Sequence, residues 1–162
     1  MIIHVNSPAE TSRLAEKIGQ NIPAGTVIAL YGEMGAGKTV FAQGLAKGLG
    51  ITEQVTSPTF LLLQEYDGHR HKGAHEFDSL MPTTFCHIDA YRLEGLDDDA
   101  LYETGLAECF NGTNIVLIEW AEFLVPLLPA ERIDIHIKKT AAAEGREISI
   151  VAGSQFPVAS LL

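Results

Sequence analysis

The sequence predicts an α/β fold with a mixed, mostly parallel sheet, helices that flank it and antiparallel strands at its edges. Residues 26–31 and 114–118 are almost continuously apolar, which is typical of strands buried on both faces of a parallel sheet. A glycine-rich segment and then an amphipathic helix follow the first of these strands directly. Residues 132–138 and 147–151 alternate apolar and polar side chains, so we expect an antiparallel pair joined near Gly145.

Local signals place the other elements. Residues 2–5 predict a short edge strand. A helix should begin after Ser7, because a Ser cap, Pro8 at the first helical position and Glu10 three residues after the cap favour a helix start. Gly19 is expected to end this helix. We further predict a helix over residues 40–49, strands over 59–66 and 85–91, a polar hairpin loop over 67–84, a helix over 96–110 and a short helix over 121–128.

Length and composition indicate one soluble domain over residues 1–162. No apolar run is long enough to span a bilayer, and the short apolar stretch at the N-terminus has no positive charge before it. We therefore expect a cytoplasmic protein with no secretory signal and no membrane partner. Cys86 and Cys109 are far apart in sequence and belong to no C-x-x-C pair, so two reduced thiols are expected.

The charge balance is acidic, with 11 Lys and Arg against 21 Asp and Glu and a formal net charge of -10. Affinity for nucleic acid depends on cations that displace counterions from phosphates. No run of Lys and Arg occurs in the sequence to provide a basic patch. If the protein acts on RNA or DNA, we expect a partner protein to hold the nucleic acid.

The most specific motif is the glycine-rich segment, residues 32–39, which reads G-E-M-G-A-G-K-T and matches G-x-x-x-x-G-K-[ST]. Glycines in such a loop turn the backbone so that amides point at phosphate oxygens. Lys38 would reach the β- and γ-phosphates, Thr39 would offer its hydroxyl to magnesium, and the following helix would add its dipole. The sequence therefore predicts a P-loop NTPase-like domain that binds a nucleoside triphosphate with Mg²⁺.

Two carboxylates are candidates for the metal site or for orienting the attacking water. Glu119 directly follows the buried strand over residues 114–118, and Asp89 lies in the predicted strand over 85–91. In P-loop NTPases such an acid often stands at the end of a buried strand. The residues alone do not decide between the two.

Four motifs together resemble the TsaE (YjeE) family. They are the glycine loop, Ser57-Pro58-Thr59-Phe60, the segment H-I-D-A-Y-R-L over residues 87–93, and Ile118-Glu119-Trp120, in the family's order and approximate spacing. The resemblance covers residues 11–132. It implies a small bacterial ATPase with a mixed sheet and flanking helices, needed to make threonylcarbamoyladenosine beside the tRNA anticodon. By resemblance the partners are the transferase TsaD and its dimerisation subunit TsaB, with tRNA met only through them.

The resemblance also implies roles for single residues. Lys38, Asp89 and Glu119 would be catalytic, with Asp89 near the γ-phosphate, and Thr39 and Glu119 would hold Mg²⁺. Residues 57–60 would form a switch segment whose hydroxyls sense that phosphate. The residues expected to bind ATP are Thr11, Gly35, Ala36, Gly37, Lys38, Thr39, Val40 and Arg132. Trp120 matches an exposed aromatic of the family, and both a partner interface and core packing remain open for it.

The segment over residues 67–84 is longer than the resemblance leads us to expect. It contains His69, His71 and His75, for which we expect a solvated loop in preference to a metal site. Two other functions remain open. A small-molecule kinase would share the loop but needs a lid with several arginines, and a nucleotide-dependent binding module would not hydrolyse its ligand. A GTPase is disfavoured because no N-K-x-D motif is present.

Overall fold

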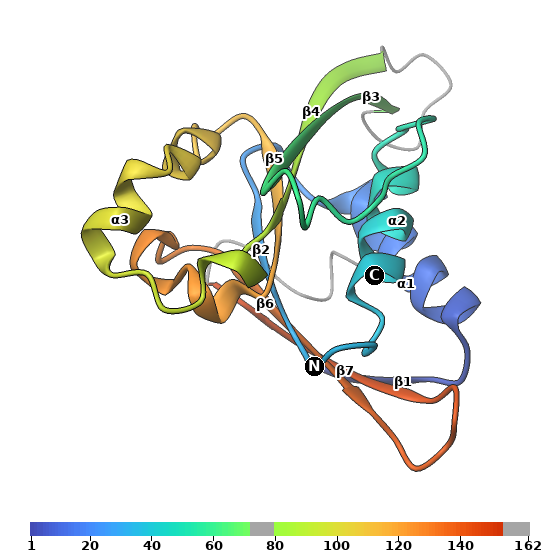
Figure 1. Cartoon of the computed structure of the whole chain (residues 1–162). Coiled ribbons are helices and arrows are strands. Elements are labelled where there is room, and N and C mark those ends of the chain that lie inside the picture. The colour runs from blue at the N-terminus through green and yellow to red at the C-terminus, as the bar shows by residue number, and fades with distance from the viewer. Residues whose placement is uncertain (72–79, 154–162) are drawn as a thin grey trace.

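The computed structural model describes residues 1–71 and 80–153, and these form a seven-stranded sheet with the order β1-β7-β6-β2-β5-β4-β3 (Figure 1). Strands β6, β2, β5 and β4 are parallel neighbours at the centre. Strands β7 and β1 add antiparallel pairs at one edge, and β3 adds one at the other. The predicted mixed sheet with antiparallel edges is confirmed. The strands are β1 Ile2–Val5, β2 Val27–Tyr31, β3 Leu63–His71, β4 Leu80–Asp89, β5 Ile115–Glu119, β6 Ile133–Lys139 and β7 Arg146–Ala152.

Helices cover both faces of the sheet. Helices α1 and α2 pack against each other on one face, and α3 lies with several 3-10 helices on the opposite face (Figure 1). Alternate residues of the central strands point to the two faces, so that Ile115 and Leu117 join one core cluster and Val116 and Ile118 the other. The helical elements are α1 Pro8–Asn21, α2 Lys38–Gly48, α3 Asp98–Glu103 and the 3-10 helices Tyr91–Leu93, Leu106–Cys109, Ala121–Phe123 and Val125–Leu127.

The start of α1 agrees with its sequence signal, whereas its end does not. The Ser7 hydroxyl accepts a hydrogen bond from the Glu10 amide at 3.2 Å, as expected for a cap. The helix continues past Gly19 to Asn21, so the predicted end is wrong. Gly19 instead allows close helix packing, because a Cβ built there would lie 3.1 Å from Gly48 Cα of α2. The glycine serves the contact that holds α2 against α1.

The hairpin of β3 and β4 differs most from the prediction. Residues 59–62 form a turn in which the amides of Leu61 and Leu62 both donate to the Pro58 carbonyl at 2.8 Å, so β3 begins only at Leu63. The expected loop over 67–84 is wrong at both of its ends, because the paired strands extend from Asp67 opposite Thr84 to His71 opposite Leu80. His69 and His71 therefore lie in β3. His75 lies outside the described residues.

The two predicted helices on the α3 face are broken into short pieces. Residues 96–110 contain α3 and a 3-10 helix, separated by Gly105 in the left-handed conformation (φ 73°). Residues 121–128 form two 3-10 helices, and Pro126 in the second has no amide hydrogen to continue a helical ladder.

Cys86 and Cys109 are both buried and free, as predicted. Burial raises the pKa of each thiol, which keeps both protonated at neutral pH. Among the described residues, no helix has the length and apolar character needed to cross a bilayer.

Candidate functional site

The glycine loop connects the buried strand β2 to helix α2 and bends through conformations that other residues avoid. Gly35 has φ 74° and Gly37 has φ 108°, both in the left-handed region where a Cβ is strained. Helix α2 begins at Lys38, directly after Gly37. The amides of its first turn have no partner within the helix. These amides and the positive end of the helix dipole are therefore available to bind an anion above the loop.

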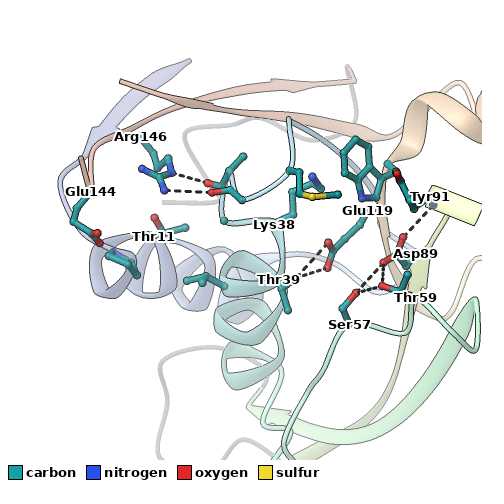
Figure 2. Close-up of a pocket in the computed structure, with 17 residues that line it drawn as sticks. Thr11, Lys38, Thr39, Ser57, Thr59, Asp89, Tyr91, Glu119, Glu144 and Arg146 are labelled. Atoms are coloured by element: carbon teal, nitrogen blue, oxygen red, sulfur yellow. Dashed lines mark hydrogen bonds between the residues drawn. The ribbon is translucent and has the colours of Figure 1, made fainter. Parts of the chain in front are cut away.

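A cavity of about 490 Å³ opens over this loop, a volume typical of small-ligand sites (Figure 2). Every predicted site residue except Arg132 lines it. Those residues are Thr11, Gly35, Ala36, Gly37, Lys38, Thr39, Val40, Asp89 and Glu119. The sheet thus brings together side chains from α1, the loop, α2, β4 and β5.

Lys38 is folded back onto its own loop. Its Nζ donates to the carbonyl oxygens of Gly32 at 2.6 Å and Glu33 at 3.1 Å, and lies 3.7 Å from the centre of the Trp120 ring. Burial lowers the pKa of Lys38, and the nearby carboxylates, Glu119 foremost, act in the opposite direction. Trp120 lines the cavity, with the left-handed conformation φ 57°. It packs against the core cluster on the α3 face, in line with one of the two alternatives left open from the sequence, and it also serves as a platform for the lysine.

Thr39 and Glu119 meet at the base of the cavity. The Thr39 hydroxyl lies 3.3 and 3.4 Å from the two carboxylate oxygens of Glu119, although 80 residues separate them (Figure 2). Glu119 is only 3% exposed, and its Oε1 also contacts His87 Nε2 at 3.0 Å. A hydroxyl and a carboxylate side by side are the oxygen donors that Mg²⁺ prefers.

Asp89 is buried, and one of its two carboxylate oxygens is held by the predicted switch segment. Its Oδ2 accepts hydrogen bonds from the hydroxyls of Ser57 at 2.8 Å and Thr59 at 2.6 Å, and its Oδ1 accepts from the Tyr91 amide at 3.0 Å (Figure 2). Strands β4 and β5 are in register with Asp89 opposite Glu119, so both acids stand at the same edge of the sheet. The contacts distinguish them: Glu119 faces Thr39, and Asp89 holds the segment.

Arg132, which was expected near the nucleotide, is not part of the cavity lining, whereas Arg146, for which no position was predicted, is. Arg132 lies away from the cavity lining, where its guanidinium donates to Asp134 at 2.8 Å and to the Pro129 carbonyl at 2.9 Å. Arg146 lines the cavity instead and donates from Nε to the Ala36 carbonyl at 2.7 Å. Sequence reasoning missed Arg146, because only the pairing of β6 and β7 brings the start of β7 to the loop.

A strand, a glycine loop ending in Lys-Thr and a helix, set on a sheet with parallel central strands, define the P-loop NTPase-like fold class. The family model for threonylcarbamoyl adenosine biosynthesis protein TsaE matches residues 5–148. The chain therefore belongs to the TsaE family, whose members take part in the biosynthesis of threonylcarbamoyladenosine in tRNA.

Relatives support the same family. The chain is 39% identical to the tRNA threonylcarbamoyladenosine biosynthesis protein TsaE of Bacillus subtilis, over 90% of this chain and 82% of that protein. It is 38% identical to the TsaE protein of Treponema pallidum, over 89% of this chain and 95% of that protein. The crystal structure of Bacillus subtilis YdiB superposes with a TM-score of 0.72 and 30% identity, covering 96% of this chain and 88% of the other.

Proposed function

We propose that this chain is a Mg²⁺-dependent ATPase that serves tRNA threonylcarbamoyladenosine synthesis by driving the cycle of the TsaB–TsaD transferase. The observation that carries the proposal is the pairing of Thr39 with Glu119, within 3.4 Å, at the base of a cavity built on the phosphate loop. The family places the protein in the pathway, and the loop supplies the chemistry of phosphate binding.

Thr39 and Glu119 would hold the magnesium ion. When bound with the nucleotide, Mg²⁺ neutralises negative charge on the phosphate oxygens. Lys38 would exchange its two carbonyl acceptors and the Trp120 ring for phosphate oxygens. Hydrogen bonds between charged groups are about twice as strong as those to neutral acceptors, so this exchange favours the bound state.

Asp89 would couple the γ-phosphate to the segment over residues 57–60. In the structure its Oδ2 accepts from Ser57 and Thr59. Either hydroxyl can also donate to a phosphate oxygen, and turning toward it would release the segment from Asp89. Asp89 would then be free to orient the attacking water. In this way the presence of the γ-phosphate would change the surface that a partner protein meets.

The charges around the cavity favour slow hydrolysis by the chain alone. Among the described residues that line the cavity, Arg146 is the one arginine, and it is held by the loop carbonyls. Rapid phosphoryl transfer in P-loop enzymes commonly needs an arginine at the transferred phosphate. We expect a partner to supply the missing positive charge or to reorganise the site. The net charge of -10 likewise favours contact with tRNA through TsaB and TsaD.

Phosphate release from ATP with Mg²⁺ tests the proposal, measured with the chain alone and with purified TsaB and TsaD. Stimulation by the partners that disappears in Lys38→Ala is the expected result. Lys47→Ala is the matched control, because Lys47 is exposed at the other end of α2. Tight ATP binding without stimulated release would favour a nucleotide-dependent binding module. Transfer of labelled phosphate to a small acceptor would show a kinase.

A further inference from the structure

We propose that His87 is a positioning residue that fixes the carboxylate of Glu119 for metal binding. The inference rests on the proposed function, because it takes Glu119 as a ligand of Mg²⁺. His87 is fully buried in β4, and it is outside the set of predicted site residues and outside the cavity lining. His87 can therefore influence the nucleotide site only through the residues that it contacts.

The strand register places His87 next to Glu119. His87 lies opposite Leu117 of β5, and Asp89 lies opposite Glu119, so these side chains share one face of the sheet at neighbouring positions. His87 Nε2 is 3.0 Å from Glu119 Oε1, whereas the Thr39 hydroxyl lies at 3.3 and 3.4 Å from the two oxygens on the side of α2. The carboxylate is thus held between a buried ring and the start of α2.

The contact determines where the imidazole hydrogen lies. A carboxylate oxygen that is to bind Mg²⁺ can only accept, so Nε2 must be the donor. Within the described part of the chain, Nδ1 of His87 has no hydrogen-bond partner. A lone pair without a partner is tolerated in a buried site better than an N–H without one, which agrees with a hydrogen on Nε2 and none on Nδ1.

Packing alone does not account for this side chain. The ring stacks on Phe85 with 5.9 Å between centroids, a contact that an apolar side chain would also make. An apolar residue at this position would avoid the unpaired ring nitrogen. It would, however, deprive Glu119 Oε1 of its shortest hydrogen bond. The polar contact of His87 is therefore directed at the proposed metal ligand.

The expected effects follow from how such supporting contacts act on metal sites. Loss of a residue that orients a metal ligand weakens metal affinity or activity about 10- to 100-fold. We expect this loss of Mg²⁺ affinity in His87→Leu, which keeps an apolar side chain but has no donor. His87→Gln should stay within about threefold of the original chain, because its side-chain amide can donate near the Nε2 position. His4→Leu is the matched control, because the side chain of His4 in the edge strand β1 is exposed.

The test is calorimetric titration of Mg²⁺ into each protein with saturating ADP, beside ADP binding without metal. Weaker Mg²⁺ binding in His87→Leu, with metal-free ADP binding preserved and cooperative thermal unfolding retained, supports the positioning role. Equal Mg²⁺ affinity in His87→Leu and the original chain overturns it and leaves the proposed function standing. If the original chain shows no Mg²⁺ binding beside ADP, the proposed metal site falls and the inference falls with it.

A second measurement decides the matter even if His87→Leu does not fold. Nitrogen-15 NMR of the histidine rings in the metal-free original chain reports the tautomer of His87 directly. The Nε2–H tautomer, with a ring shift that changes in Glu119→Ala, is expected. The Nδ1–H tautomer, or a ring shift that is insensitive to Glu119→Ala, would contradict the proposed contact.

Discussion

Replacing Thr59 with valine removes one of the two hydroxyls that hold Asp89 Oδ2, with almost no change of shape. The lost hydrogen bond is 2.6 Å long and reaches a carboxylate that is 2% exposed. Hydrogen bonds to charged groups contribute about 1.5–3 kcal/mol. Thr59 itself is half-buried, so water can partly replace its hydroxyl, and we take the lower value, about 1.5 kcal/mol. For a chain of this size that loss lowers the thermal midpoint by about 3–6 °C.

Urea unfolding followed by circular dichroism measures the change, and Thr56→Val is the matched control. Thr56 lies three residues earlier, just before the segment over residues 57–60, and its side chain is exposed, so its replacement should change the free energy of unfolding by less than about 0.5 kcal/mol. Hydrogen exchange gives a local readout, because the amides of Leu61 and Leu62 both donate to Pro58 in the adjoining turn. Equal stability of the two variants, with unchanged exchange at these amides, would refute the role assigned to Asp89.

Three other results are expected. In Gly48→Ala the new Cβ would overlap the backbone of α1. The cost of overpacking outweighs the better helix propensity of alanine, so urea unfolding should show a net loss of about 1 kcal/mol in the free energy of unfolding. An increase in that free energy would contradict the close packing of the two helices. Burial raises the pKa of Cys86. Above pH ~8.5 the thiol of the unfolded chain loses a proton that the folded chain keeps, so the free energy of unfolding falls by up to about 1.4 kcal/mol per pH unit. Urea unfolding at pH 7–9.5 should show this fall in the original chain and lack this component in Cys86→Ala. Identical dependence of stability on pH in the two proteins would exclude a contribution from Cys86. Trp120 is the single tryptophan, so Lys38→Met should change its emission, whereas Lys47→Met should not; two unchanged spectra would argue against the lysine–ring contact.

Several elements were predictable because their causes are local. The strand over Val27–Tyr31, the glycine loop and the start of α2 are consecutive in sequence, and each depends on the conformational preferences of its own residues. The start of α1 follows equally from Ser7 and Pro8. The order of the four motifs was enough to indicate the TsaE family, which the family model confirms.

Errors at element ends have a common cause, because packing overrides local signals. Gly19 has the residue type of a helix end, yet the helix continues, since the glycine is used for contact with α2. The polar residues after Asp67 resemble a loop, yet they extend β3, because β4 runs beside them as a pairing strand as far as His71. In both places the neighbouring element, absent from any local window, decides the conformation.

The phosphate loop, the central strands and the acids that could bind a metal follow from the amino-acid sequence alone. How these residues pair with one another follows from the folded arrangement of strands and helices. The parallel register of β4 and β5 places Asp89 beside Glu119, and the packing of α2 on that face brings Thr39 to Glu119 across 80 residues of sequence. Local preferences act over a few residues, whereas these pairings depend on strand order and helix packing, which form only when the whole core is buried.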